Sequence, residues 1–300
     1  MVLEFRHDAT KNITIISASK RSQRPTVYSE KVFCPFDKGS EKSTPPTSFA
    51  LPENENWKIR CFENLYPVLK KEGEFKKGEG FWKSNAVGMH EVIVETDNHG
   101  ELFQNFTKEQ LKLVLKAYLN RFKFFTENNE YAFLFKNHGK GSGASIDHEH
   151  SQIIGLPFVP EVIESESRLC EKQCFFCNPG EAVLETEHFK VIAPSFARFP
   201  LEIWFIPKRH VKTLLDLTEE EGLDFMLLLK KIIEKQYEKS KDYTIAFHSG
   251  FRGKDFHFHI EFYPRPNVWG GIELGTGVII NTKTEEDVKE LFQTLTTQSP

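Results

Sequence analysis

The chain has 300 residues, enough for one large domain or two fused smaller ones, and an ordinary share of apolar residues. Its formal net charge of -4 argues against a general nucleic-acid-binding protein, whose binding surface would be basic. No segment is long and apolar enough to span a bilayer, and residues 1–10 lack the apolar core of a signal peptide. We therefore expect a cytoplasmic protein with no membrane or nucleic-acid partner.

The first half of the chain contains a helix, a strand and a glycine-rich turn in succession. Residues 107–110 are typical of a capping box, and apolar residues then recur on one helical face as far as Phe122. A strand-like run at 131–135 and a turn at 137–143 follow. A motif of two histidines and a glutamine at alternate positions comes next.

The second half repeats this order. Residues 218–221 again form a capping box, and an amphipathic helix continues to Ile233. The segment 243–247 reads as a strand and 249–254 as a turn, and a second alternating histidine motif follows at 257–261. One such parallel could arise by chance, but the same elements in the same order indicate a duplication.

We therefore predict an α+β fold of two tandem histidine-triad-like halves, with mainly antiparallel sheets flanked by helices. The expected halves are residues 1–165 and 166–300, because the segment 157–171 is rich in Pro, Glu and Ser. Each half also carries a cysteine-bearing turn upstream of its helix, at 34–37 and at 174–177.

The first-half motif, His148, His150 and Gln152, has the spacing of a site for phosphoryl chemistry. Residues two apart on an extended segment point to the same face, so these three side chains would converge. The glycine-rich loop just upstream can turn backbone N–H groups toward a phosphate, and Ser145 can add a hydroxyl donor.

A neutral imidazole is a good nucleophile near neutral pH and can form a covalent bond to phosphorus. The Gln152 amide can donate to a non-bridging oxygen as charge builds there. The alternative is that these are polar strand residues in an ordinary surface pocket. The combination of the alternating motif with the upstream glycines favours the reactive site.

This part of the chain has the pattern Asn137-x-Gly139-x-x-x-Gly143-x-Ser145-x-x-His148-x-His150-x-Gln152. The pattern resembles the active-site signature of the galactose-1-phosphate uridylyltransferases. That family lies in the transferase branch of the histidine-triad superfamily, with ADP-glucose phosphorylases and diadenosine polyphosphate phosphorylases. The resemblance covers most of the chain. Further segments similar to those of the family are 21–25, 34–37 with 44–46, 62–67, 88–95 and 270–277.

The resemblance implies that His150, assisted by Gln152, carries a nucleoside monophosphate between two sugar phosphates in a ping-pong cycle. It implies that the partners, a nucleotide sugar and a sugar 1-phosphate, are bound by Arg21, Arg24, Asn64, Asn137, Gly143, Ser145 and Glu273. The alternative for Arg21 and Arg24 is that they only form part of a solvated basic face with Lys20. The family precedent also implies a homodimer.

Cys174 and Cys177 have the spacing of a zinc knuckle. By the resemblance, His210 and His257 complete a closed Cys2His2 site, so the zinc would be structural. The alternative is a pair of cysteines that only pack together or form a redox pair. Cys170 stands nearby with the wrong spacing for this pair.

A second metal site is implied in the first half, where Asp37 replaces the second cysteine of the usual pair. The residues of this site are Cys34, Asp37, His99 and His148. They could hold zinc, because a carboxylate is an acceptable ligand, or they could form a metal-free hydrogen-bonded cluster. We expect Cys61 to lie in the core. His259 and Glu261 are either substrate contacts or ordinary strand residues.

The resemblance gives UDP-glucose as donor and galactose 1-phosphate as acceptor. However, Leu65, Asn267 and Ile272 depart from the residues of the classical uridylyltransferases, and 273–277 is at least as close to the phosphorylase-like relatives. The alternative is therefore an adenylyl transfer of the kind catalysed by ADP-glucose or diadenosine polyphosphate phosphorylases.

Two further classes of protein are consistent with the same fold. A non-catalytic nucleotide-sugar binding protein would keep the two halves, but the intact His150 and Gln152 argue against it. A hydrolase would release the nucleotide to water. By the resemblance, the two-half architecture and a glutamine, not a histidine, at position 152 favour transfer over hydrolysis.

Overall fold

The computed structural model describes residues 3–18, 21 and 33–296, which form two β-sheets and five α-helices. The helices are α1 (Lys108–Asn128), α2 (Glu161–Lys172), α3 (Glu219–Tyr237), α4 (Gly271–Thr276) and α5 (Glu285–Thr296). The strands are β1 (Leu3–Asp8), β2 (Ile13–Ala18), β3 (Thr47–Leu51), β4 (Ile59–Glu63), β5 (Trp82–Asn85), β6 (Met89–Val94), β7 (Tyr131–His138), β8 (His150–Leu156), β9 (Leu184–Glu185), β10 (Phe189–Ile192), β11 (Ile203–Pro207), β12 (Tyr243–His248) and β13 (His259–Pro264). Arg24, a predicted nucleotide contact, lies outside the described residues.

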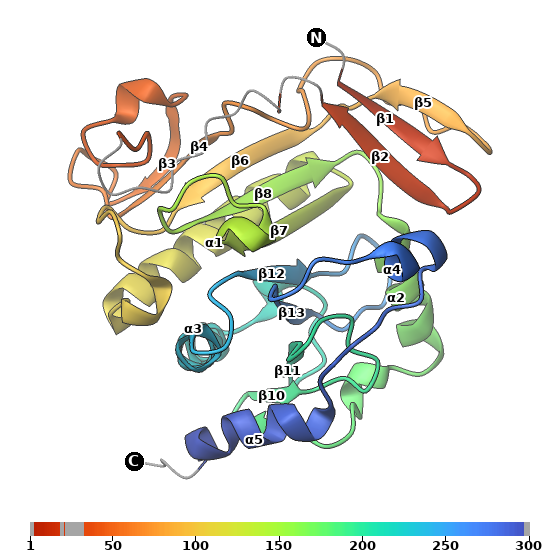
Figure 1. The fold of residues 1–300 in the computed structure, drawn as a ribbon. Helices are drawn as coiled ribbons and strands as arrows, with labels where there is room; N and C mark the ends of the chain where they lie inside the picture. Colours follow the sequence, from red (N-terminus) through yellow and green to blue (C-terminus); the bar gives the residue numbers. More distant parts are fainter. Residues whose placement is uncertain (1–2, 19–20, 22–32, 297–300) are drawn as a thin grey trace.

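The larger sheet has ten strands in the order β3-β4-β6-β8-β7-β12-β13-β11-β10-β9, and its neighbours pair antiparallel (Figure 1). Outward from the centre, the first half gives β7, β8, β6, β4 and β3, and the second gives β12, β13, β11, β10 and β9. In each half the two central strands follow a long helix, α1 or α3, and the other three precede it. The predicted α+β fold of two tandem halves is therefore confirmed.

The two halves meet where β7 pairs with β12, with Phe135 opposite Ala246 and His138 opposite Tyr243. This pairing makes one continuous sheet across the chain. The expected boundary between residues 165 and 166 falls within α2, the helix that follows the last strand of the first half.

The two long helices begin with different caps. Thr218 and Glu221 form the predicted capping box, because Glu221 N donates to Thr218 Oγ1 at 3.2 Å and Thr218 N donates to the Glu221 carboxylate at 2.7 Å. At the start of α1 only half of the box forms: Gln110 N donates to Thr107 Oγ1 at 3.1 Å. The Gln110 side chain instead donates to the backbone carbonyl of Glu95 at 2.5 Å.

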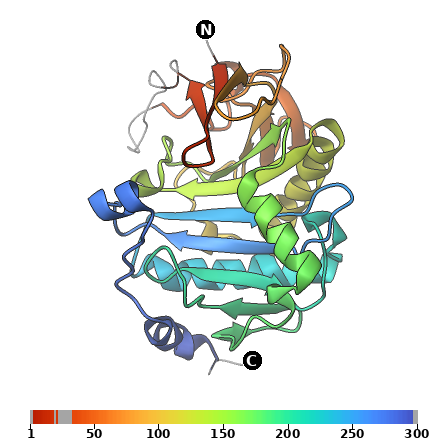
Figure 2. The same cartoon turned by 90° about the vertical axis from the view of Figure 1, so that its right-hand side faces the viewer.

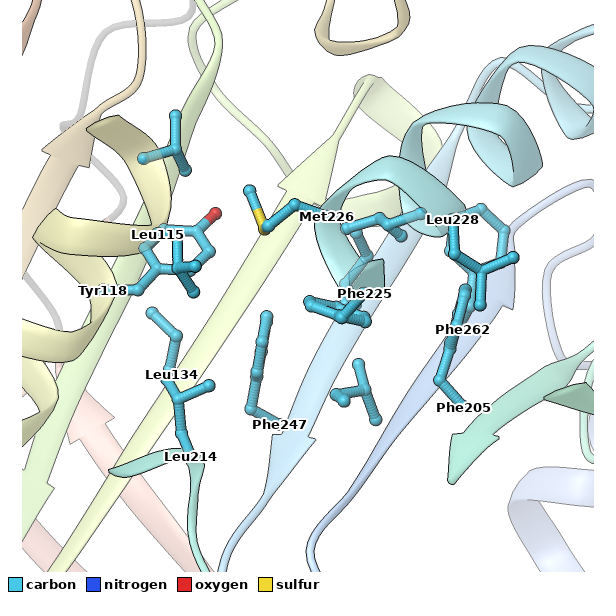
Figure 3. Packing of buried hydrophobic residues seen from close by; sticks show 14 of the residues in the cluster. Leu115, Tyr118, Leu134, Phe205, Leu214, Phe225, Met226, Leu228, Phe247 and Phe262 are labelled. Atoms are coloured by element: carbon cyan, nitrogen blue, oxygen red, sulfur yellow. The ribbon is translucent and has the colours of Figure 1, made fainter. Parts of the chain in front are cut away.

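The main core lies between the long helices and the central strands (Figure 3). The ring of Phe247, on β12, is edge-on to Tyr118 of α1 and Phe225 of α3, at centroid distances of 5.7 and 5.9 Å. Burial of one such phenylalanine contributes about 1.5–3 kcal/mol. Gly222 lets α3 approach α1 closely, since a Cβ added there would lie 2.8 Å from Leu115 Cδ2.

The opposite side of the sheet carries α2, which crosses in front of the strands in Figure 2 while α3 lies behind them. A three-stranded sheet in the order β2-β1-β5 packs nearby through buried Leu3 and Phe5, and the Phe5 ring lies 5.1 Å from that of Phe158. Among the described residues, no helix is both long and apolar enough to cross a membrane.

Candidate active site and metal-binding groups

A cavity of about 410 Å³ opens beside β8. It brings together predicted site residues from distant segments: Arg21, Asn64, Gly143, Ser145, His150 and Gln152. The rest of its wall is largely apolar and includes the rings of Phe33, Phe36, Phe62 and Tyr66. A pocket with apolar walls and a few convergent polar groups is typical of a small-molecule site.

The alternation of β8 explains how this wall is built. His150 and Gln152 line the cavity, whereas Ser151 and Ile153 face the opposite way. Ser151 Oγ lies 2.7 Å from the Tyr118 hydroxyl of α1, and Ile153 belongs to the main core. The strand begins at His150, so His148 lies just before it.

His150 is held in one tautomer. Its Nδ1 lies 2.7 Å from the backbone carbonyl of His148, so Nδ1 carries the hydrogen and donates it there. The other ring nitrogen, Nε2, is then left with its lone pair. Burial lowers the pKa of His150 to about 4, so the imidazole is neutral at pH 7.

Gln152 is also held by hydrogen bonds. Its side-chain oxygen lies 2.9 Å from His90 Nε2 and accepts from Asn64 Nδ2 at 3.3 Å. No role was predicted for His90, which lies on the neighbouring strand β6. Its only signal in the sequence is its place in 88–95, a segment similar to a strand of the uridylyltransferases.

The loop between β7 and η4, the 3-10 turn at Lys140–Ser142, is anchored to the second half of the chain. Gly141 N donates to Asp242 Oδ2 at 2.9 Å. Gly139 has a φ of 79°, and a Cβ added there would lie 1.7 Å from Asp242 Oδ1. Only glycine therefore fits this contact, which holds the loop that leads to Gly143 and Ser145.

Charged residues not predicted from the sequence are buried on the far side of β8. Lys136 Nζ pairs with Glu95 at 2.5 Å and with Glu149, and lies 3.4 Å from the backbone carbonyl of His150. His138 Nδ1 lies 3.1 Å from Glu149 Oε1. Although burial opposes ionisation, Lys136 and His138 hold the pKa of Glu149 well below its usual range. These ion pairs fix β7 and β8 relative to each other.

Cys174, Cys177, His210 and His257 come together as predicted, with one potential ligand atom from each within 4.8 Å of the others. His257 Nε2 lies 2.9 Å from the backbone carbonyl of Pro207, which leaves Nδ1 free of its hydrogen and facing Cys174 Sγ at 3.5 Å. Such a second contact orients a histidine for metal binding. Cys170 Sγ lies 3.6 Å from Cys174 Sγ, outside this group of four.

Cys34, Asp37, His99 and His148 form a second group of the same kind, also within 4.8 Å. Asp37 Oδ1 lies 2.8 Å from His99 Nδ1 and 3.1 Å from His148 Nδ1. His148 Nε2 lies 2.8 Å from the backbone carbonyl of Thr96, the counterpart of the His257 contact with Pro207. The donor set fits a metal ion, and a hydrogen bond from His99 Nδ1 to Asp37 fits the metal-free cluster.

A third group contains Glu166, His248, His259 and Glu261, whose ligand atoms likewise lie within 4.8 Å and could hold a metal ion. Although burial opposes its protonation, Glu261 and Glu166 raise the pKa of His248 to about 9. His259 is the repeat counterpart of His150, and its Nδ1 lies 2.9 Å from the backbone carbonyl of His257. Its ring is fully buried and stacks on Phe176 at a centroid distance of 4.0 Å.

Two predicted substrate contacts, Asn137 and Glu273, do not line this cavity, although Asn137 lines a neighbouring cavity of about 200 Å³ that also borders His150. Asn137 Oδ1 accepts from Thr244 Oγ1 at 3.0 Å across the seam. Glu273 lies on α4, where its carboxylate accepts from Gly270 N at 2.9 Å and caps the helix. Ile272 is exposed on the same helix, whereas Leu65 lies in the cavity wall.

Two family profiles match the chain. The galactose-1-phosphate uridyl transferase C-terminal domain matches residues 133–268. The N-terminal domain of a family of unknown function, DUF4931, matches residues 59–159.

The similarity to known proteins extends over nearly the whole chain. A galactose-1-phosphate uridylyltransferase of Thermotoga maritima is 31% identical over 98% of this chain and 99% of its own length. An ADP-glucose phosphorylase of Arabidopsis thaliana is 30% identical over 97% of this chain and 92% of its own. A crystal structure of an Arabidopsis ADP-glucose phosphorylase with bound ADP-glucose has a TM-score of 0.78, 29% identity, and covers 96% of this chain and 98% of its own. A uridylyltransferase structure has a TM-score of 0.82 and 25% identity, and the match covers 99% of this chain and 100% of that structure's chain.

The similarity to both relatives covers nearly the whole chain, so it includes both halves and the segment that carries His150. With 31% identity over 98% of its residues, this chain belongs to the galactose-1-phosphate uridylyltransferase family of nucleotidyltransferases.

Proposed function

We propose that this protein is a hexose-1-phosphate uridylyltransferase that works through a nucleotidyl-His150 intermediate. The observation that carries the proposal is the fixed tautomer of His150: Nδ1 donates to the His148 carbonyl, and Nε2 keeps its lone pair in a residue that lines the cavity. Family membership supports the same reaction class.

In the first step, His150 Nε2 attacks the α-phosphorus of UDP-glucose. The bond from that phosphorus to the bridging oxygen breaks, and glucose 1-phosphate leaves with the electron pair. Gln152, which lines the same cavity, donates its amide N–H to a non-bridging oxygen as negative charge builds there. Because burial lowers the pKa of His150 to about 4, no base is needed to deprotonate the nucleophile at pH 7.

In the second step, a phosphate oxygen of galactose 1-phosphate attacks the same phosphorus. The phosphorus–nitrogen bond breaks, UDP-galactose leaves, and His150 returns to its neutral form. The glycine loop ending at Gly143 and Ser145 lines the cavity beside His150, where backbone N–H groups and a hydroxyl suit the transferred phosphate.

Adenylyl transfer is the second candidate. The similarity to the Arabidopsis ADP-glucose phosphorylase is nearly as high as that to the Thermotoga uridylyltransferase, at 30% against 31% identity. In that case ADP-glucose is the donor and inorganic phosphate the acceptor. The cavity wall around Phe36, Phe62 and Tyr66 is largely aromatic, and an aromatic surface can stack on a uracil or an adenine ring.

We propose zinc at the group of Cys174, Cys177, His210 and His257, where two thiols and two imidazoles match its preferred ligands. Bound there, zinc would be structural and would tie the cysteine turn to the segments that follow β11 and precede β13. The group of Cys34, Asp37, His99 and His148 is the proposed second site, with the metal-free cluster as its alternative. The five free cysteines suit a reducing cytoplasm.

A homodimer is also proposed. The segment around α4 exposes Val268, Leu274 and Val278, which a second subunit would cover. Analytical ultracentrifugation at micromolar concentration tests this: a dimer is expected, and a single monomer species contradicts it.

The nucleotidyl-enzyme is the intermediate to detect. The protein is mixed with UDP-glucose alone, and in parallel with ADP-glucose alone, and its intact mass is measured. We expect a mass increase of one uridylyl group, released glucose 1-phosphate, and transfer of the label to galactose 1-phosphate. An adenylyl adduct discharged by inorganic phosphate supports the second candidate.

The matched variants are His150→Asn and His188→Asn. His188 lies in the turn between β9 and β10, away from the cavity lining, so its variant should label as the wild type does. His150→Asn should fold and form no adduct. If His150→Asn still labels and turns over normally, the mechanism is wrong. If the wild type forms no adduct and releases no sugar phosphate, a non-catalytic nucleotide-sugar binding protein takes its place.

A further inference from the structure

His90 is buried behind Gln152 and is 5% exposed. It lies on β6, which pairs with β8 in a register that places Val92 opposite Gln152 and His90 opposite Ile154. His90 and Gln152 are therefore diagonal neighbours on the same face of the sheet.

The hydrogen bonds of His90 fix its tautomer. The backbone N–H of Val68 points at Nδ1 from 3.3 Å, so Nδ1 accepts. Burial lowers the pKa of His90 to about 3, so the ring is neutral and carries its one hydrogen on Nε2. That hydrogen is donated to Gln152 Oε1 at 2.9 Å. The opposite tautomer would direct Nδ1–H at the Val68 N–H.

Asn64 acts on the same oxygen. Its Oδ1 accepts from Tyr66 N at 2.9 Å, which leaves Nδ2 as the donor. Nδ2 lies 3.2 Å from His90 Nε2, but both atoms carry hydrogens, so its acceptor is Gln152 Oε1 at 3.3 Å. Two backbone N–H groups, those of Val68 and Tyr66, therefore fix the direction of two donors that meet at one oxygen.

We propose that His90 is a positioning residue that fixes the amide of Gln152, so that its NH2 group and not its oxygen is presented to the transferred phosphate. The inference rests on the proposed nucleotidyl transfer. A glutamine amide can turn over at little cost in shape, which would exchange donor and acceptor. With both donors on Oε1, the turned amide would place its NH2 against two N–H groups and its oxygen against a phosphate oxygen.

The test compares two substitutions at position 90. In His90→Asn the shorter amide can still accept from Val68 N, but it no longer reaches Gln152. In His90→Gln the side-chain NH2 takes the place of Nε2 and restores the donor. The readout is the single-turnover rate constant of adduct formation on His150, measured over a range of donor concentrations with whichever donor labels the wild type.

At saturating donor, we expect His90→Asn to lower the rate constant by about tenfold to a hundredfold, the effect of removing a residue that orients a metal ligand, since His90 orients Gln152 in the same indirect way. The donor concentration at half-saturation should change by less than about threefold, because the amide acts mainly on charge that builds in the transition state. His90→Gln should recover most of the rate.

A double-mutant cycle separates positioning from a purely structural role. In a Gln152→Ala background there is no amide to orient, so adding His90→Asn should leave the rate constant unchanged. A fall by the same factor in both backgrounds, or a wild-type rate in His90→Asn, overturns the inference while leaving the proposed function in place. Absence of any adduct in the wild type overturns both.

Discussion

Replacement of Gly139 by alanine should destabilise the protein through one contact between its halves. Gly139 has a φ of 79°, and the added Cβ would lie 1.7 Å from Asp242 Oδ1 and 2.8 Å from Asp242 Cγ. These atoms cannot overlap, so the Asp242 carboxylate must turn away. It then loses its hydrogen bond from Gly141 N, now 2.9 Å long.

The expected cost has two parts. With a φ of 79° and a ψ of 167°, the Gly139 backbone lies in a region that is essentially restricted to glycine, where alanine costs about 1–3 kcal/mol. Loss of a hydrogen bond to a charged acceptor adds about 1.5–3 kcal/mol. We therefore expect Gly139→Ala to lower the free energy of unfolding by about 2.5–6 kcal/mol.

Gly180→Ala is the matched control, because Gly180 has a φ of 91° with nothing within 4 Å of an added Cβ. It should show the backbone cost alone, so Gly139→Ala should exceed it by about 2 kcal/mol in urea denaturation. The double variant Gly139→Ala/Asp242→Ala removes the clash with the carboxylate, so its cost should be less than the sum of the two single costs. If Gly139→Ala and Gly180→Ala differ by less than about 0.5 kcal/mol, the reasoning about this contact is refuted.

Three further predictions concern charge and metal. Because burial lowers the pKa of His150 to about 4, the imidazole stays unprotonated above that pH, and the rate constant of adduct formation should be nearly flat from pH 7 to pH 5. A rate constant that falls tenfold in this range, as expected for a histidine of ordinary pKa, contradicts a neutral His150 as the nucleophile. Lys136→Met leaves Glu95 and Glu149 buried without their cation and should lower the free energy of unfolding by about 3–5 kcal/mol in urea denaturation. Lys289→Met, which removes only the surface pair with Glu181, should cost far less, and equal costs would exclude a structural role for the buried pairs. Cys177→Ser should reduce bound metal by about one ion per chain and Cys170→Ser should not, as measured by elemental analysis of the purified protein; equal metal content in the two variants would remove Cys177 from the ligands.

The parts of the site that the sequence predicted are those encoded over short distances. His150 and Gln152 are two residues apart, and alternation along one strand is enough to place them on one wall. The spacing of Cys174 and Cys177 is equally local. The duplication was visible because each copy keeps its helix, strand and histidine motif in the same order.

The parts that were missed depend on which strands become neighbours. His90 reaches Gln152 only because β6 pairs with β8, and Lys136 meets Glu95 only because β7 and β6 flank β8. Propensity and periodicity do not give strand order. The Gln110 side chain shows the same limit, since its carbonyl acceptor on Glu95 comes from another element and competes with the local capping box.

The continuous sheet also bears on how the two halves came to differ. A symmetric dimer of identical subunits carries the same residue at both copies of every position, so any substitution that improves one copy of a site is imposed on the other. Joining the halves in one polypeptide removes that restriction. Here one copy of the repeated histidine, His150, lies in the wall of an open cavity, while the other, His259, is buried beneath Phe176 and beside Glu261. The fused chain can thus specialise one half for chemistry and use the other as the rigid frame that aligns it.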